Sequence, residues 1–455
     1  MAHKTGAAHV ELWELSRTTD KTITGRFQIV NDGQSPLDLT TSLLEQGLDN
    51  GGFNLGGTAL VDAQNNRLYM PMRTTDNKCL CSDLSGKPVP PNGRLDLYAV
   101  FSAPPADVTE ATINMPLTVP FQDVQIGSGP VSAVPDQIDP ATAALAPARS
   151  FSISSIVEGD EESVDEDAAN RSVRLSADVL FALNKADLTS RADGVLQDLA
   201  QQINASTGSS VKIDGYTDTS GNDAVNQPLS ERRARSVQTR LKTLVTRHGV
   251  SYESAGHGSK DPVASNDSDT GRRRNRRVTV TFARPAPPAR TTAPAPTGTP
   301  FQRSQGNAPV LGTAQFKVPE AKDVKVEVNG LHRDQTGLTT LAWTVKNTGT
   351  GEVAVGSMFE KSEALHGGGA PHRGATTGGV MLVDPTAKNH YEPLQVENGQ
   401  CLCTSLILDA KTTLGPGESI TYSDLYKLPA DLRKVDVQVP WLSSEFATAS
   451  GLTVQ

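Results

Sequence analysis

Two charged residues in the middle of the chain have the types and the spacing of a small ligand-binding site. Asp218 lies in DGYTDTSG (214–221), just past a predicted strand, and Arg233 lies fifteen residues further on, in the first turn or so of a predicted helix. Open α/β sheets bind ligands near such strand ends. An aspartate can take an ammonium and an arginine can bind a carboxylate through two hydrogen bonds, so the pair suits a zwitterion. Amides near Ser230, at the predicted start of the helix, would add donors for the same carboxylate. On spacing alone, a structural Asp218–Arg233 ion pair explains the pattern equally well.

Hydrophobic periodicity indicates the elements that must position these residues. Helical patterns run from about Ser190 to Asn204 and from about Ser230 to His248. Short apolar runs flank and separate them, and turn-forming residues bound these runs. The candidate strands are Val173–Phe181, Val211–Tyr216, Tyr252–Gly256 and Val278–Ala283. Strands that alternate with helices predict an α/β sandwich with βαβ crossovers over residues 171–283.

The same segment resembles a known family through a set of ordered motifs. These are VLFALNKADL from Val179, TD-x-x-G from Thr217, N-x-x-LS-x-x-RA from Asn226, and N-x-x-x-x-GR-x-x-NRRV ending at Val278. The segment is similar to the OmpA-like C-terminal domain, a peptidoglycan-binding module. The resemblance covers about 110 residues, roughly a quarter of the chain, and does not extend to the flanking regions.

The resemblance implies non-covalent binding of the diaminopimelate residue in the peptidoglycan stem peptide. It assigns the diaminopimelate ammonium to Asp218 and the carboxylate to Arg233. The other matched positions that would line the pocket are Thr217, Ser220, Asn226 and Arg276. Asn184 and Lys185 replace an acidic residue that is common in the family. We expect no cofactor, no bound metal and no catalytic residue at this site.

An arginine-rich run at residues 272–277 is typical of a solvated basic face with some attraction to anionic wall polymers, and nucleic-acid binding is the alternative. Five arginines in six residues could bind nucleic-acid phosphates, but no aromatic residues are interleaved with them, and Asn275, Arg276 and Arg277 fit the family pattern. We therefore expect no nucleic-acid partner. Lys and Arg outnumber Asp and Glu by 17 to 12 between Arg171 and Ala283, whereas the whole chain has a net charge of −9. A basic centre between acidic arms favours binding to an anionic polymer.

The regions on either side of this segment repeat one another. The matched residues are Val10 and Val326, Phe27 and Trp343, Asp62 and Asp384, Cys79 and Cys401, Tyr98 and Tyr422, and Pro116 and Pro440. The numbering offset rises only from 316 to 324 along the copies, so short loop insertions account for it. Alternating apolar runs at hairpin spacing predict strands. Residues 1–130 and 313–455 are thus predicted to be two related, all-β, immunoglobulin-like sandwich domains.

Two segments are predicted to be linkers. Residues 131–170 contain a Pro/Ala spacer and the acidic run EGDEESVDED, which is typical of a solvated linker and, as an alternative, of a metal-binding loop. Residues 284–312 begin RPAPPARTTAPAPTGTP, which is typical of a semi-extended spacer. His366 and His372, in HGGGAPH, are expected to lie in a flexible loop, with a metal site as the alternative.

Four cysteines form two C-x-C pairs, Cys79 with Cys81 and Cys401 with Cys403. On a strand, residues i and i+2 share a face, with Cα atoms near the upper limit for a disulfide, so a local bridge needs a bulge or a tight bend. We expect local disulfides; free thiols and a metal or redox site are the alternatives. The C-x-C pair occurs in both copies, which indicates that it is a structural feature of the β-domain rather than part of a single site.

The predicted function is that of a non-enzymatic cell-wall-binding adaptor. Its β-domains would contact a partner protein, the wall itself or each other. No apolar run approaches the roughly 18 residues of a membrane helix. The N-terminal MAHKTGAAHVELWEL has no apolar core of a signal peptide, so we expect the leader to be absent from this numbering. The expected location is the cell envelope or the exterior, with the cytoplasm as the alternative. A wall-remodelling or redox enzyme with its activity in a β-domain, and a protein-interaction scaffold without wall binding, are the alternative functions.

Overall fold

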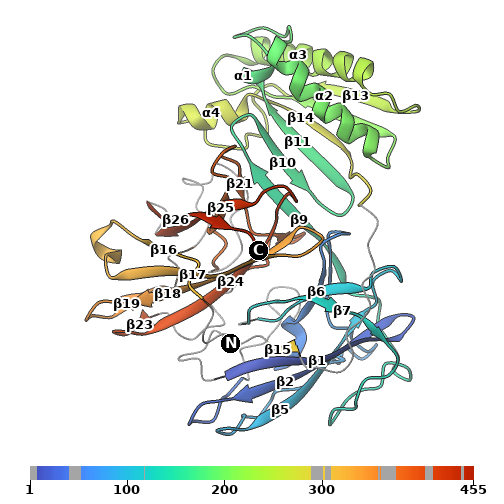
Figure 1. Ribbon diagram of the computed structural model, residues 1–455. Coiled ribbons are helices and arrows are strands. Elements are labelled where there is room, and N and C mark those ends of the chain that lie inside the picture. Colours follow the sequence, from blue (N-terminus) through green and yellow to red (C-terminus); the bar gives the residue numbers. More distant parts are fainter. Residues whose placement is uncertain are drawn as a thin grey trace.

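Strands make up most of the fold, and the α-helices of the described residues all lie in its middle third (Figure 1). The structure is a computed structural model. It describes residues 8–39, 53–116, 118–287, 301–302, 309–356, 359, 376–404, 413–441 and 445–455. The candidate metal ligands His366 and His372 and most of the predicted linker 284–312 lie outside the described residues.

The N-terminal unit consists of two packed sheets. One has the strand order β15-β1-β2-β5, with β8 beside β1, and the other has the order β7-β6-β3-β4-β9. A buried cluster that includes Phe27 and Leu97 from the first sheet and Leu60 and Phe121 from the second fills the space between them. The strands of this unit are β1 (Ala8–Thr19), β2 (Thr22–Asn31), β3 (Ala59–Asp62), β4 (Arg67–Tyr69), β5 (Arg94–Ser102), β6 (Glu110–Asn114), β7 (Phe121–Gln125) and β8 (Gly127–Ser128).

The C-terminal unit has the same arrangement. Its sheets have the orders β16-β17-β18-β24 and β26-β25-β20-β21-β9, and Trp343, Leu382 and Val437 lie in the core between them. Its strands are β16 (Gly312–Gln315), β17 (Val324–Arg333), β18 (Leu338–Asn347), β19 (Val353–Ala354), β20 (Met381–Val383), β21 (His390–Tyr391), β22 (Gln395–Val396), β23 (Thr413–Leu414), β24 (Ser419–Lys427), β25 (Lys434–Trp441) and β26 (Glu445–Thr453). The short strand β15 (Phe301–Gln302) pairs with β1 in the first sheet of the N-terminal unit. Both copies are therefore sandwiches, while their immunoglobulin-like class stays a prediction.

Strand register corrects one detail of the repeat. Phe27 lies opposite Leu97 in the first copy, and its counterpart Trp343 lies opposite Tyr422 in the second. The counterpart of Tyr422 is thus Leu97, and the match of Tyr98 to Tyr422 was wrong by one residue. Register fixes which side chains face the core, whereas a shared residue type does not.

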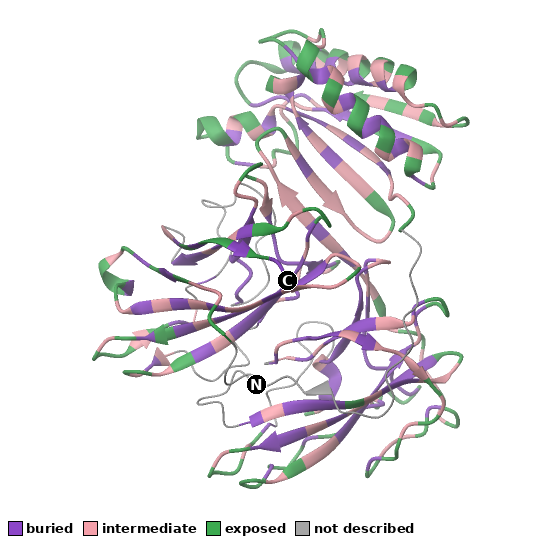
Figure 2. Ribbon diagram, in the orientation of Figure 1, coloured by how far each residue is buried: buried purple, intermediate pink, exposed green. Residues whose placement is uncertain are grey.

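The central unit is the predicted α/β sandwich. Its sheet has the order β13-β12-β14-β11-β10-β9, with β12 and β13 parallel and the other pairs antiparallel. The helices α2 and α3 pack on one face, over a core that includes Leu196, Ile213 and Val237 (Figures 1 and 2). The elements are β9 (Ser150–Glu158), β10 (Glu162–Glu166), β11 (Asn170–Ser176), α1 (Ala177–Leu180), α2 (Ser190–Ala205), β12 (Ser210–Gly215), α3 (Asp223–Leu244), β13 (Ser251–Gly256), α4 (Asp269–Asn275) and β14 (Arg277–Ala283).

The segment 131–170 is folded, which corrects the prediction of a linker. Val134, with Ile138 and Leu145, packs against a small cluster on the N-terminal unit that includes Tyr98. The strand β9 then pairs with β4 of the N-terminal unit, with β21 and β22 of the C-terminal unit, and with β10 of the central unit. One strand therefore belongs to all three units (Figure 1).

Three cations surround Glu166, a residue of the acidic run. The Glu166 carboxylate lies 3.2 Å from the Nζ of Lys427, 3.2 Å from Arg171 Nη1 and 3.2 Å from Arg284 Nε. It also accepts a hydrogen bond of 3.3 Å from Asn66 Nδ2. Glu166 lies on β10, Asn66 belongs to the N-terminal unit and Lys427 to the C-terminal unit, so this cluster joins the three units.

None of the helices in the described part of the chain combines the length and the apolar composition that crossing a membrane requires. Buried residues follow the inward faces of the sheets, and exposed residues cover the outer faces of α2 and α3 (Figure 2).

The structure contains the disulfides Cys79–Cys81 and Cys401–Cys403, with Cα separations of 5.1 Å and 5.2 Å. These separations lie within the range that a disulfide spans. We expect the purified protein, denatured without reductant, to give no reaction with a thiol reagent and to give four thiols after reduction. Any thiol detected before reduction would contradict the two local bridges.

Candidate functional site

The loop between β12 and α3 carries the first part of the site. Strand β12 ends at Gly215, where an added Cβ would lie 2.3 Å from the carbonyl oxygen of Ser230, so only glycine lets the strand approach α3 this closely. Asp218 follows and is 5% exposed. Its Oδ1 accepts a 2.8 Å hydrogen bond from the Ser220 amide, and its backbone oxygen accepts a 3.3 Å bond from Asn226 Nδ2. The loop thereby fixes the direction of the carboxylate.

Thr217 anchors the same loop from the other side. Its amide donates to the carbonyl oxygen of Gly258 at 2.8 Å, which ties the loop to the segment after β13. The buried Thr217 hydroxyl has no hydrogen-bond partner within the described chain. The four predicted residues Thr217, Asp218, Ser220 and Asn226 are therefore brought together.

Arg276 connects this loop to two carboxylates. It follows the short helix α4, and its Nη1 lies 2.7 Å from Asp218 Oδ2. Its Nε and Nη2 donate to Asp178 at 3.0 Å and 2.6 Å, which is the two-pronged geometry of a strong arginine–carboxylate pair. The hydrogen bonds from Arg276 are the main cause of a lowered pKa of Asp178.

Asp178 belongs to this charged cluster, and the sequence analysis did not predict it. It lies on α1, directly before the motif that begins at Val179, where a strand was predicted. The signal available in the sequence was an acidic residue next to a family motif on the same sheet edge as Asp218. Only the fold brings it within reach of Arg276.

Arg233 lies beside Asp178, Asp218 and Arg276, but among the described residues no carboxylate pairs with it. Its side chain is 4% exposed, its Nε donates to the carbonyl oxygen of Lys185 at 3.0 Å, and its guanidinium lies 5.2 Å from the centre of the Phe181 ring. Burial lowers the pKa of Arg233, and the charges of Asp178 and Asp218 act in the opposite direction. Within the described residues the carboxylates of this cluster pair with Arg276 instead. A structural Asp218–Arg233 ion pair is thus not what the structure contains.

The helix that carries Arg233 begins earlier than predicted. Asn222 caps α3 by accepting a 3.1 Å hydrogen bond from the Val225 amide, and the helix starts at Asp223 with Pro228 in its second turn. The amide of Ser230 consequently lies inside the helix and is not available to a ligand. Arg233 is in the third turn, and its long side chain reaches back towards the loop that holds Asp218.

The arginine-rich run is largely engaged within the protein. Arg272 pairs with Asp269, Arg274 pairs with Glu158, and the guanidinium of Arg277 lies 3.7 Å from the centre of the Tyr216 ring. Burial lowers the pKa of Arg277 to about 10. These contacts leave few free cations for an extended polyanion, although the exposed Arg273 remains.

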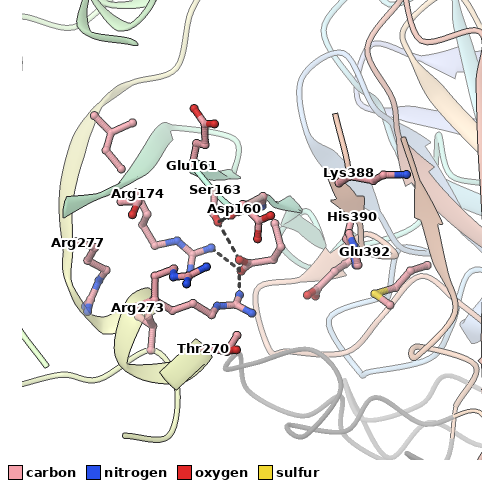
Figure 3. Close-up of a pocket in the computed structure, with 17 residues that line it drawn as sticks. Asp160, Glu161, Ser163, Arg174, Thr270, Arg273, Arg277, Lys388, His390 and Glu392 are labelled. Carbon is pink, nitrogen blue, oxygen red and sulfur yellow. Dashed lines mark hydrogen bonds and ion pairs between the residues drawn. The ribbon is translucent and has the colours of Figure 1, made fainter. Parts of the chain in front are cut away.

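A cavity of about 170 Å³ lies between the central unit and the C-terminal unit (Figure 3). Glu158 is one of the lining residues and accepts hydrogen bonds from Arg174 at 2.8 Å, from Ser163 at 2.8 Å and from Arg274. Lys388 and His390 form the opposite wall. Helix α4 thus connects two regions. Arg276, which follows the helix, pairs with Asp218, and Arg274, within the helix, pairs with Glu158 at the junction of the central and C-terminal units. Among the described residues, no group of three or more His, Cys, Asp or Glu side chains is placed to hold a metal ion.

Comparisons with known proteins support the family resemblance of the central unit. The model of the OmpA family matches residues 180–276. The putative lipoprotein YfiB of Escherichia coli is 36% identical over 123 residues, which are 26% of this chain and 75% of YfiB. The peptidoglycan-binding protein ArfA of Mycobacterium tuberculosis is 36% identical over 104 residues, which are 22% of this chain and 31% of ArfA. Outer membrane porin F of Pseudomonas aeruginosa is 37% identical over 109 residues, which are 23% of this chain and only 30% of the porin.

Among solved structures, the cell wall anchor of the T6SS from Pseudomonas aeruginosa is 27% identical, and the match covers 27% of this chain and 88% of that chain at a TM-score of 0.25. The decisive relative is YfiB, because the chain covers three quarters of it at 36% identity. The flanking sandwiches lie outside the segment that the family model matches. Through its central unit, the chain belongs to the OmpA family.

Proposed function

We propose that the central unit binds peptidoglycan non-covalently and holds the diaminopimelate residue of the stem peptide between Arg233 and Asp218. The observation that carries this proposal is the buried Arg233 guanidinium, which has no carboxylate partner among the described residues. A buried cation that no carboxylate contacts is costly unless a ligand supplies that contact. The free carboxylate on the diaminopimelate side chain would supply it through two parallel hydrogen bonds.

The charges of the site support a zwitterionic ligand. Asp178 and Asp218 carry two negative charges, and Arg233 and Arg276 carry two positive charges, so the cluster is neutral without a ligand and stays neutral with a zwitterion. The diaminopimelate ammonium would share the carboxylate of Asp218 with Arg276, which now lies 2.7 Å from it. Thr217, Ser220 and Asn226 would hold the loop in place rather than contribute charge.

The names of the relatives support the same ligand and a place in the cell envelope. ArfA is named a peptidoglycan-binding protein, and porin F is named an outer-membrane protein. A protein that binds peptidoglycan must work outside the cytoplasmic membrane. For this chain we therefore propose the periplasm, the wall or the exterior as its location, and a binding role that needs no catalysis.

We further propose that the two sandwiches, which we assign to the immunoglobulin-like class, act as an adaptor module for a partner protein. The sandwiches contact each other: Gln122 Nε2 donates to the Leu338 carbonyl oxygen at 3.2 Å, and His332 Nε2 lies 2.8 Å from Asp123 Oδ2. This contact supports a single rigid platform rather than two independent arms. The platform would present a partner at a fixed position relative to the wall.

Co-sedimentation with isolated sacculi tests the wall-binding proposal. Sacculi with diaminopimelate and sacculi with lysine at the same peptide position form a matched pair, because lysine keeps the ammonium and lacks the side-chain carboxylate. We expect the protein to pellet with the first and to bind the second at least about tenfold more weakly, since the hydrogen bonds to Arg233 are lost. Failure to pellet with either wall would refute the proposal, and equal pelleting would refute the role of Arg233.

Replacing Asp178 with alanine tests whether Arg276 must be held in place. The Asp178 carboxylate is 41% exposed, so solvent screens the pair, and we expect a loss of at most about 1 kcal/mol. Retention on diaminopimelate walls should then weaken by no more than about fivefold. Titration of sacculi against a fixed protein concentration measures the change, and complete loss of retention would instead make Asp178 a direct ligand of the ammonium.

A further inference from the structure

The two sandwiches differ at three core positions that lie together. All six side chains at these positions are 0% exposed. The first copy has Phe27, Leu55 and Ala99 at these positions, and the second copy has Trp343, Thr377 and Asp424. An apolar set in one copy thus corresponds to a hydrogen-bonding set in the other, and the same sandwich forms with both.

Backbone pairing establishes which residues correspond. Ala99 pairs with Cys81 in the first copy, and Asp424 pairs with Cys403 in the second, each as an isolated antiparallel bridge. The two cysteines are the second members of the two disulfides. The acid of the second copy therefore occupies the place that alanine occupies in the first.

The third position follows from equivalent hydrogen bonds. The Leu55 amide donates to the carbonyl oxygen of Ser82 at 3.2 Å, and the Thr377 amide donates to that of Thr404 at 3.0 Å. Ser82 and Thr404 each follow the second cysteine of their copy. Leu55 and Thr377 are thus counterparts, and all three polar substitutions of the second copy meet around one carboxyl group.

The carboxyl group of Asp424 is held by two donors. Trp343 Nε1 donates to its Oδ2 at 2.8 Å, and the Thr377 hydroxyl donates to its Oδ1. A buried carboxyl group is costly, and the first copy shows that this fold does without one. The group is therefore not required for packing, and its surroundings are built to hold a carboxyl group in one orientation.

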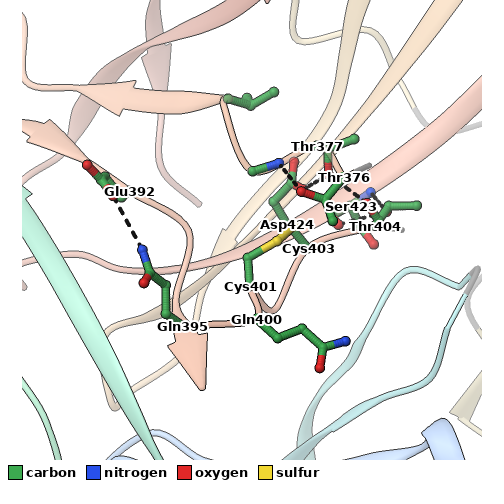
Figure 4. The surroundings of a disulfide bond; sticks show 12 residues. Thr376, Thr377, Glu392, Gln395, Gln400, Cys401, Cys403, Thr404, Ser423 and Asp424 are labelled. Atoms are coloured by element: carbon green, nitrogen blue, oxygen red, sulfur yellow. Dashed lines mark hydrogen bonds between the residues drawn. A yellow bond between two sulfur atoms is a disulfide. The ribbon is translucent and has the colours of Figure 1, made fainter. Parts of the chain in front are cut away.

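The same carboxyl group lies beside a disulfide. Residues directly opposite each other in an antiparallel pair project to the same face, with Cβ atoms about 5 Å apart. The pairing of Cys403 with Asp424 therefore brings the carboxyl group next to the Cys401–Cys403 bridge (Figure 4). The bridge of the first copy has only the methyl group of Ala99 at this place.

We propose that Cys401–Cys403 is a thiol–disulfide exchange site and that Asp424 moves the proton in the exchange. The substrate class is a dithiol, in a protein or in a small molecule. The first-copy bridge, Cys79–Cys81, has no such acid and serves as a structural bridge. This proposal is independent of peptidoglycan binding, because it involves another unit and other residues.

The exchange balances without a further reagent. A substrate thiolate attacks the sulfur of Cys403, the more exposed cysteine of the pair, and the Cys401–Cys403 bond breaks. The sulfur of Cys401 leaves as a thiolate and takes the proton that Asp424 carried. The second substrate thiol then loses its proton to the Asp424 carboxylate. Its thiolate attacks the first substrate sulfur, forms the substrate disulfide and displaces the sulfur of Cys403. That sulfur takes up the proton that the first substrate thiol released when it ionised. The products are a dithiol at Cys401 and Cys403 and an oxidised substrate disulfide, and the reverse reaction uses the same groups.

The ionisation of Asp424 suits this role. Burial raises its pKa to about 7, and the hydrogen bonds from Thr377 and Trp343 offset part of that rise. Trp343 and Thr377 carry no charge. Burial raises the pKa of the neighbouring Tyr426, and the charge of Asp424 raises it further. A group with a pKa near 7 both gives and takes a proton at neutral pH.

The two bridges in one molecule provide the test. Each consists of one buried and one half-buried cysteine, and Cys81 and Cys401 are both 6% exposed. The full-length protein is treated with dithiothreitol for short times between pH 5.5 and 8.5, alkylated, and the two cysteine peptides are quantified by mass spectrometry. The ratio of the two reduction rates cancels the ionisation of dithiothreitol itself.

We expect the Cys401–Cys403 bridge to react on the order of a hundredfold faster at pH 6, which is the lower end of what a positioned acid contributes. The ratio should fall as the pH rises through about 7, because Asp424 then loses the proton that the leaving sulfur needs. Asp424→Asn should bring the ratio close to one at every pH.

A second variant guards against a folding defect. Trp343→Phe, Thr377→Leu and Asp424→Ala together copy the apolar set that the first sandwich already accommodates. We expect this variant to fold and to reduce both bridges at similar rates. Equal rates in the unmodified protein, or a fast and pH-dependent Cys401–Cys403 bridge in both variants, would overturn the proposal.

Discussion

Replacing Arg233 with alanine is expected to remove retention on diaminopimelate-containing sacculi almost completely. The change deletes a buried guanidinium that has no carboxylate partner among the described residues. It would also remove the two proposed hydrogen bonds to the diaminopimelate carboxylate. A hydrogen bond to a charged group contributes about 1.5–3 kcal/mol, so losing two weakens binding by roughly a hundredfold or more. Co-sedimentation over a range of sacculus concentrations measures the loss.

Arg235 on the same helix provides the matched control. Its side chain is 68% exposed and pairs with Glu231 at 3.6 Å, so Arg235→Ala removes an equal charge away from the site. We expect Arg235→Ala to bind like the unmodified protein. Arg233→Lys should fall between the two, because lysine keeps the charge and cannot form two parallel hydrogen bonds. Undiminished pelleting of a folded Arg233→Ala protein would refute the assigned site.

Replacing Glu166 with alanine is expected to cause the largest loss of stability. Glu166 is the carboxylate that Arg171, Arg284 and Lys427 share, and its side chain is only 12% exposed. Without it, three cations lie close together with reduced compensation. Breaking a buried pair in this way costs about 3–5 kcal/mol, which urea unfolding at pH 7 measures from the shift in midpoint.

The Glu166 variant should also change the response to acid. Burial alone would raise the pKa of Glu166, but the charges of Lys427, Arg171 and Arg284 outweigh burial and lower it. A carboxyl group with a lowered pKa stabilises the fold above its unfolded pKa, and this contribution is lost as the pH falls through the folded value. The unmodified protein should therefore lose stability below about pH 4.5 more steeply than Glu166→Ala.

Glu161→Ala is the control for this prediction, because Glu161 is 48% exposed and pairs with the exposed Arg191. Surface pairs of this kind contribute about 1 kcal/mol or less. If Glu166→Ala and Glu161→Ala lowered the free energy of unfolding equally, the cluster at Glu166 would not join the three units.

The sequence predicted the central unit well because its signals are local. The apolar periodicity of Ser190–Asn204 is confirmed by α2, and the motif residues Asp218 and Asn226 lie together as their spacing within one loop and helix requires. The start of α3 was missed by seven residues. Pro228 and the polar residues before it resemble a turn, whereas Asn222 caps the helix and Pro228 lies inside it, in its second turn.

The features that the sequence did not predict depend on partners far along the chain. Glu166 resembles part of a solvated acidic run until Arg284 and Lys427 are placed beside it. Asp178 has no partner within its own segment, because Arg276 lies 98 residues further on. The polar set around Asp424 becomes visible only when strand register aligns the two copies. Local composition therefore predicts poorly the contacts of residues whose partners lie in other units or far along the chain.

The sharing of β9 has a consequence for the order of events during synthesis. The edge of β9 that pairs with β22 stays unpaired until Gln395, the partner of Ser154, has been synthesised 241 residues later. At about 5–20 residues per second the ribosome needs roughly 12–50 seconds to deliver that partner. During this interval β9 can already pair with β4 of the N-terminal sandwich. The opposite edge of β9 then exposes unpaired amides and carbonyl oxygens, which can pair with a strand of another chain. Nascent chains of this protein therefore expose an unpaired β-edge until the last third has been translated.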